Sequence, residues 1–115
     1  MSEISRIEII TNFSKFDVLR QILSKYEIGG MTAVQCMGCG LEKGTQEYVP
    51  EIQSEMTLLP KWLVILYVRT DIVDELVDKI EKTLYTGHIG DGKIIVSDVR
   101  DVYRIRTGEN GVTAL

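Results

Sequence analysis

The fold is decided by residues 61–96, KWLVILYVRTDIVDELVDKIEKTLYTGHIGDGKIIV. Residues 61–69 form an almost unbroken apolar run, which is typical of a buried strand. From Thr70 the apolar residues recur at three- and four-residue steps, which predicts a helix that ends at residues 86–87. A glycine-rich loop follows, and the β-branched residues at 93–96 predict the next strand. This stretch is therefore a strand-helix-strand unit.

The N-terminal part of the chain has the same arrangement. A β-branched strand is expected at residues 4–11, a helix from Ser14 to residues 29–30, and a strand at residues 32–36. A further strand is expected at residues 102–106. Together these elements predict an α+β, ferredoxin-like βαββαβ fold with an additional C-terminal strand and a long loop between the second and third strands. Both helices are expected on one face of the sheet. Self-association is expected to cover the other face, because the strands are too apolar to face water.

Length and composition predict one globular domain over residues 1–115. The chain has 44% hydrophobic and 26% charged residues, and a chain of 115 residues can bury one modest core. A net charge of −4 argues against a general nucleic-acid or anionic-membrane binder, which needs a basic face. No apolar run approaches the ~20 residues of a membrane helix. With two cysteines and no leader pattern at the N-terminus, a cytoplasmic location is expected.

Residues 39–60 form a connection that is longer than most connections within a domain and lacks a periodic apolar pattern. Glutamates outnumber lysines in it. Two interpretations remain open: a solvated acidic hairpin, or an arm that docks on a partner. The second is favoured, because loops of this length usually carry function. We therefore expect residues 39–60 to contact a partner protein.

Residues 87–93, GHIGDGK, fit the spacing G-x-x-x-x-G-K of a phosphate loop. Ile94 stands where the magnesium-binding hydroxyl belongs, and the loop follows a helix rather than a strand, so a hydrolytic P-loop is not expected. Its three glycines still allow successive backbone N–H groups to converge on a phosphate, and Lys93 adds a positive charge. The alternative is a tight helix-to-strand turn.

Arg104 and Arg106 add to this basic character. On a strand, residues two apart share one side, so both guanidinium groups would face one way and Ile105 would face the core. Paired arginines suit a phosphate because their planar forks can each form two hydrogen bonds to it. The alternative is that they pair with nearby carboxylates, namely Asp98, Asp101 or Glu109.

Residues suited to catalysis are scarce. His88 is the only histidine, and no group of histidine, cysteine and carboxylate side chains has metal-ligand spacing. Cys36 and Cys39 have C-x-x-C spacing, but on a continuing strand they face opposite sides. We therefore favour simple strand-end cysteines over a redox or metal pair. The chain is not expected to be an enzyme.

Two segments, TGHIGDGKIIV (86–96) and RIRTGENGVTAL (104–115), resemble the two signature regions of the PII nitrogen-regulatory signal-transduction proteins. The resemblance spans almost the whole chain, with shorter matches at residues 30–32, 38–40, 43–44 and 59–61. It implies a compact homotrimer that holds ATP or ADP in clefts between subunits. It also implies that the long loop changes shape with ATP, ADP and 2-oxoglutarate. The loop would then bind an ammonium transporter in the membrane or a metabolic enzyme of nitrogen assimilation.

The resemblance also implies roles for individual residues. The nucleotide phosphates would be held by Gly90, Asp91, Gly92, Lys93, Arg104 and Arg106. The residues near the adenine and ribose would be Thr32, Gly40 and Tyr67, with Ile10 lining the pocket. Effector binding would involve Glu42, Lys43, Gly44 and Lys61.

Several positions depart from the family pattern. Glu42 replaces a glutamine that helps to hold magnesium and 2-oxoglutarate. A carboxylate there would suit Mg²⁺ but would repel a dicarboxylate by ~1 kcal/mol in water and by more in a cleft. Asn12 replaces a basic residue, and the modifiable tyrosine falls at Ser54, with Tyr48 nearby. Pro50 replaces the arginine that enters a transporter pore. Weak binding of 2-oxoglutarate is therefore expected.

Three functions remain open beside PII-type nitrogen control. A PII-like nucleotide sensor could regulate a different transporter or enzyme with little response to 2-oxoglutarate. A slow ATPase would need Asp91 or Glu42 as its base. An RNA-binding sheet is least favoured, because the strands lack stacking aromatics and the chain is acidic.

Overall fold

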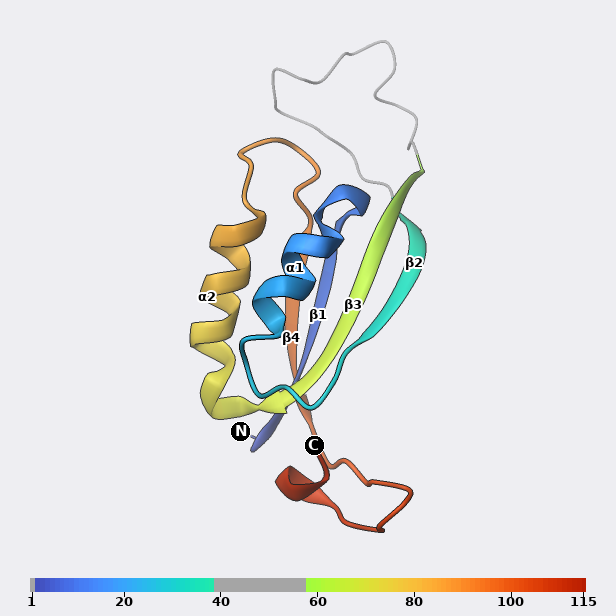
Figure 1. The fold of residues 1–115 in the computed structure, drawn as a ribbon, viewed down its shortest axis with the longest axis vertical. Helices are drawn as coiled ribbons and strands as arrows, with labels where there is room; N and C mark the ends of the chain where they lie inside the picture. The colour runs from blue at the N-terminus through green and yellow to red at the C-terminus, as the bar shows by residue number, and fades with distance from the viewer. Residues whose placement is uncertain (1, 39–57) are drawn as a thin grey trace.

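The computed structural model describes residues 2–38 and 58–115. One antiparallel sheet has the strand order β2-β3-β1-β4 (Figure 1). The strands are β1 (Ile4–Asn12), β2 (Thr32–Gly38), β3 (Leu59–Arg69) and β4 (Lys93–Val99). The helices are α1 (Phe16–Leu23), which follows β1, and α2 (Val73–Leu84), which follows β3. This is the ferredoxin-like βαββαβ order, so the predicted α+β fold is confirmed.

Both helices cover one face of the sheet, as predicted. Their periodic apolar residues form one buried core with alternate residues of the central strands, such as Ile7 and Ile9 of β1 and Leu66 of β3. Leu19 of α1 and Leu76 of α2 are fully buried in this core. Burying one such side chain contributes roughly 1.5–3 kcal/mol, so this layer provides the main driving force for folding.

The opposite face of the sheet is not covered by a helix in the ranges that the structure describes. We call it the open face. Val34 of β2, Tyr67 of β3 and Ile95 of β4 remain 45%, 37% and 41% exposed. Ile10 of β1 pairs with Lys93 of β4, which places their side chains together on this face. The apolar residues agree with the expectation that another surface covers the open face.

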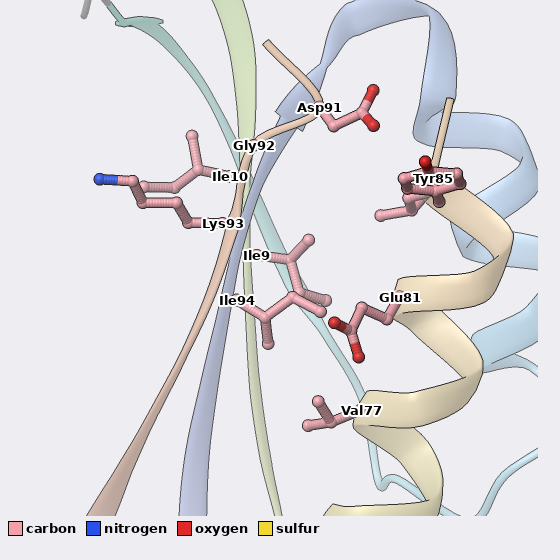
Figure 2. Close-up of a pocket in the computed structure, with 10 residues that line it drawn as sticks. Ile9, Ile10, Val77, Glu81, Tyr85, Asp91, Gly92, Lys93 and Ile94 are labelled. Carbon is pink, nitrogen blue, oxygen red and sulfur yellow. The ribbon is translucent and has the colours of Figure 1, made fainter. Parts of the chain in front are cut away.

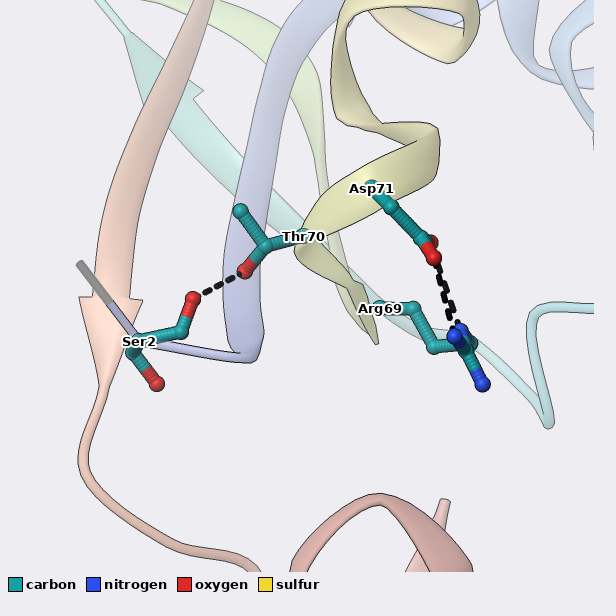
Figure 3. A network of polar contacts seen from close by, with 4 residues as sticks. All are labelled: Ser2, Arg69, Thr70 and Asp71. Carbon is teal, nitrogen blue, oxygen red and sulfur yellow. Dashed lines mark hydrogen bonds and ion pairs between the residues drawn. The ribbon is translucent and has the colours of Figure 1, made fainter.

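The start of α2 is fastened to the N-terminal end of β1. Thr70 begins a 3₁₀ turn (Thr70–Ile72) before the helix, and its hydroxyl donates to the carbonyl oxygen of Ser2 at 2.7 Å (Figure 3). Arg69 and Asp71 form an ion pair of 2.9 Å at the same corner. The Thr70 bond ties the turn before α2 to the chain just before β1, whereas the exposed ion pair adds little.

The predicted additional strand at residues 102–106 is wrong. Tyr103 forms only a single bridge with Asn110, and residues 105–107 form a turn. Two backbone bonds join Arg104 to the returning chain, and the φ of +75° at Gly108 permits the reversal. The chain therefore turns back instead of pairing with the sheet. Ile105 is fully exposed rather than facing a core.

Helix α1 is shorter than predicted. It ends at Leu23, and the chain continues without regular structure to residue 30. Tyr26 and Ile28 still pack against the core. The apolar period therefore extends beyond the helix, which explains the longer prediction. Within the described ranges, no helix has the length and apolar character needed to cross a membrane.

Candidate functional site

The glycine loop, residues 85–92, connects α2 to β4. Gly90 and Gly92 adopt φ values of +97° and +103°, which residues with a side chain rarely adopt. Gly92 also lies against β1, because a Cβ atom there would come within 1.7 Å of the carbonyl oxygen of Ile10. The loop therefore needs glycine for its backbone conformation and for its close approach to β1.

The side chain of Asp91 closes the glycine loop from within. Its carboxylate accepts hydrogen bonds from the backbone N–H of Thr86 at 2.8 Å, from that of Gly87 at 3.1 Å, and from the Thr86 hydroxyl. The bonds from Thr86 are the main reason why the pKa of the Asp91 carboxyl lies below its ordinary value. Asp91 and Lys93 point away from each other in Figure 2. The Asp91 carboxylate therefore holds the loop together. The group of Asp91 that is suited to a phosphate is the backbone N–H.

We expect the glycine loop to become less ordered at low pH, when the Asp91 carboxylate is protonated. A carboxyl with a lowered pKa in the folded state stabilises the loop fully above its ordinary pKa of about 3.9. That stabilisation is lost as the pH falls through the lowered value. In Asp91→Asn, the exchange of the Thr86 and Gly87 amides should be faster at pH 7 and should show no such transition. Amide hydrogen exchange against pH checks this, with exposed Asp74→Asn as control. The same acid transition in wild type and Asp91→Asn would contradict it.

Lys93 is the first residue of β4, and its amine points away from α2 (Figure 2). It therefore shares the open face with Ile10, and both lie beside Gly92. Tyr67 lies four residues along β3 from Leu63, the partner of Ile10, which is about 13 Å. Thr32 is exposed on the edge strand β2. One chain thus brings together Ile10, Gly92 and Lys93, but leaves Thr32 and Tyr67 farther along the open face.

The two predicted arginines lie at the other end of β4. Lys93 begins this strand, whereas Arg104 and Arg106 follow its end at Val99, so about 20 Å separates the groups. Figure 1 shows the glycine loop and the C-terminal segment at opposite ends of the molecule. Arg104 donates to the carbonyl oxygen of Leu115 at 2.8 Å and lies 3.6 Å from the Glu109 carboxylate. A single chain therefore does not bring the arginines to Lys93.

A pocket of ≈ 330 Å³ lies between α2 and the edge of the sheet. Figure 2 shows Val77 and Glu81 of α2, with Tyr85 directly after the helix, on one side of it and the strands on the other. Its lining residues are Ile9, Ile10, Val77, Glu81, Leu84, Tyr85, Asp91, Gly92, Lys93 and Ile94. Lys93 borders this pocket, but its amine points away from α2 (Figure 2), so the positive charge lies on the other side of the sheet.

Comparison with known proteins identifies the family. The model of the family described as nitrogen regulatory protein P-II matches residues 4–109. The chain belongs to the PII family. The P-II protein of Klebsiella oxytoca is 42% identical over 110 residues, which is 96% of this chain and 98% of the relative. That of Bradyrhizobium diazoefficiens is 34% identical with the same coverage.

Solved PII structures have the same fold as this chain. Bacillus subtilis GlnK in complex with ATP superposes with a TM-score of 0.81 at 32% identity, covering 97% of each chain. Arabidopsis thaliana PII bound to citrate superposes with a TM-score of 0.77 at 29% identity, covering 99% of this chain and 91% of that one. The resemblance inferred from residues 86–96 and 104–115 is thus confirmed, and this chain shares the fold of a nucleotide-binding relative.

Several predicted site residues lie outside the described ranges of this PII chain. They are Gly40, Glu42, Lys43, Gly44, Tyr48 and Ser54, together with Cys39. Cys36 is half-buried in β2, and its thiol lies 3.6 Å from the carbonyl oxygen of Lys61. Among residues 2–38 and 58–115, no three histidine, cysteine or carboxylate side chains are grouped to hold a metal ion.

Lys61, predicted as an effector residue, is directed at the glycine loop. Its ammonium donates to Asn12 Oδ1 at 2.7 Å and to the carbonyl oxygen of Gly90 at 3.3 Å. In the sequence, Asn12 is notable only because it replaces a basic residue of the family pattern. Its link to Lys61 depends on the pairing of β1 with β3, which places the two residues opposite each other. No spacing along the chain could reveal this contact.

Proposed function

We propose that this PII protein is a regulatory signal-transduction trimer that binds ATP or ADP between subunits. Through the segment around residues 39–60 it would control a transporter or an enzyme of nitrogen metabolism. The observation that carries the proposal is the separation of Lys93 from Arg104 and Arg106 within one chain, in a family whose B. subtilis member was solved with ATP. Such a basic site becomes complete only when two copies face each other.

The phosphate end of the cleft combines two subunits. One supplies the backbone N–H groups of the glycine loop, at Gly90, Asp91 and Gly92, with Lys93. The next supplies Arg104 and Arg106. Arg104 donates one bond to the carbonyl oxygen of Leu115, and its contact with Glu109 is long, at 3.6 Å, and partly exposed, so that contact contributes little. The other N–H groups of the guanidinium would be able to bind a phosphate. Each charge-assisted bond would contribute ~1.5–3 kcal/mol.

The apolar end of the cleft would use the open face. Ile10 lies beside Lys93 and would line the base pocket, while Thr32 and Tyr67 would approach the adenine and ribose, with Gly40 beyond the described ranges. Covering the open face with other subunits would also bury Val34 and Ile95. The same contact would therefore both stabilise the trimer and build the nucleotide site.

Catalytic turnover has less support than regulation. Asp91, one of two candidate bases for a slow ATPase, uses its carboxylate to bind Thr86 and Gly87. Its lowered pKa further weakens it as a base. We therefore propose a binding protein rather than an enzyme.

Native mass spectrometry and calorimetry test this function directly. We expect a trimer that binds about one ATP per subunit with micromolar affinity, as three charge-assisted contacts would support. A second titration with 2-oxoglutarate and Mg-ATP separates nitrogen control from a PII-like sensor that ignores this effector. A monomer, or a trimer that binds neither ATP nor ADP, would contradict the proposal.

A further inference from the structure

The amine of Lys61 joins three segments that are far apart in the sequence. Lys61 is the third residue of β3, Asn12 is the last residue of β1, and Gly90 lies in the glycine loop before β4. The Lys61 ammonium donates to Asn12 Oδ1 at 2.7 Å and to Gly90 O at 3.3 Å. Lys61 and Asn12 are both half-buried at this junction. The loop is therefore tied to the ends of two sheet strands.

The bridge depends on one donor group, the Lys61 ammonium, and two acceptor oxygens, those of the Asn12 amide and the Gly90 carbonyl. An ammonium group has three donors and no acceptor, so it can bind the amide oxygen of Asn12 and the Gly90 carbonyl at once. A cation in place of Asn12 would repel Lys61 instead of holding it. The neutral amide at position 12 is thus what allows the lysine to reach the loop.

The bridge acts at one of the three glycines of the loop. Gly90 has a φ of +97° and no side chain that limits its conformations. Because a peptide unit is planar, holding the Gly90 carbonyl also fixes the N–H of Asp91. The Asp91 carboxylate in turn holds Thr86 and Gly87. The beginning and the end of the loop are therefore both fastened within one chain.

We propose that Lys61 is a positioning residue that holds the glycine loop ready for a phosphate, with Asn12 as its anchor. The inference rests on the proposed nucleotide site, but it assigns Lys61 a role through Gly90 rather than a direct contact with a ligand. Ordering the loop in advance removes an entropic penalty that binding would otherwise have to overcome.

Four variants test this role, with hydrogen exchange and ATP calorimetry as readouts. Lys61→Met and Asn12→Ala each remove one side of the bridge, Asn12→Lys adds repulsion, and Lys61→Gln keeps a neutral donor. Lys82→Met is the matched control, since this exposed lysine pairs only with Asp78 among the contacts found for it. Melting temperatures show whether each variant is folded.

We expect Lys61→Met, Asn12→Ala and Asn12→Lys to speed amide exchange at residues 86–88 before nucleotide is added. ATP affinity should fall about three- to ten-fold, as for the loss of one hydrogen bond. Lys61→Gln should recover part of both properties, and Lys82→Met should resemble wild type. The decisive comparison is Asn12→Ala, which keeps the lysine charge. If it leaves exchange and affinity unchanged while Lys61→Met weakens binding, Lys61 contacts the ligand directly and the proposal is wrong.

The two proposals can fail separately. Wild-type protein that does not bind nucleotide would contradict the proposed function, while the exchange measurement would still decide whether Lys61 orders the loop. Conversely, normal ATP binding with unchanged exchange in Lys61→Met and Asn12→Ala would remove the positioning role and leave the nucleotide site in place.

Discussion

Mixing subunits that carry Lys93→Ala with subunits that carry Arg106→Ala should restore high-affinity nucleotide sites, which neither variant has alone. Each substitution removes a charge-assisted contact of ~1.5–3 kcal/mol, so each homotrimer should bind ATP about ten-fold or more weakly. In a mixed trimer, one cleft receives Lys93 from one variant and Arg106 from the other. With random assembly from equal amounts, about a quarter of all clefts should be intact.

Calorimetry on co-refolded subunits measures this recovery as a fraction of sites with wild-type affinity. Mixing each variant with itself is the control, and the double variant Lys93→Ala/Arg106→Ala mixed with either single variant should recover nothing. If the first mixture showed no high-affinity sites although mixed trimers were detected by mass, Lys93 and Arg106 would not meet across subunits.

Gly92→Ala should be the most damaging single substitution in the glycine loop. Its Cβ atom would lie 1.7 Å from Ile10 O, and the φ of +103° is unfavourable for alanine. Overpacking and backbone strain together should lower the free energy of unfolding by at least about 2 kcal/mol. Because the clash can be relieved only by moving the loop away from β1, we also expect ATP binding to be lost.

Gly108→Ala is the matched control for this prediction. Gly108 also has a positive φ, of +75°, but nothing lies within 4 Å of its added Cβ in the described chain. Its loss of stability should be limited to strain of about 1 kcal/mol. Denaturant unfolding compares the two, and equal losses would show that contact with Ile10 is not what makes glycine necessary at position 92.

The sequence predicted the fold well where one local pattern decides an element. Two such patterns are the apolar run at residues 61–69 and the three- and four-residue apolar period from Thr70. Each reflects which side of one element is buried, and the structure has β3 and α2 at these places. Residues 102–106 have a strand-like alternation too, but the turn depends on bonds between Arg104 and residues 108–109. Those contacts link positions that no periodic pattern relates.

The sequence predicts the kind of site but not the arrangement of its residues. Three glycines followed by Lys93 favour an anion-binding loop, because successive backbone N–H groups can converge beside a positive charge. The direction of the Asp91 carboxylate could not be predicted, since the carboxylate is equally able to face a ligand or to bind Thr86. The distance from Lys93 to the arginines could not be predicted either. Lys93 and Arg104 are eleven residues apart, and such residues can be close when the chain turns but are far apart when a strand lies between them.

The open face has a consequence for how the protein behaves when it is scarce. If its apolar residues are covered only by other copies, part of the folding free energy belongs to association, and it falls with dilution by mass action. The melting temperature would then rise with protein concentration. Newly made chains would be the least stable and the most prone to aggregate until enough copies had accumulated. The protein would therefore need a minimum concentration before it could act as a signal.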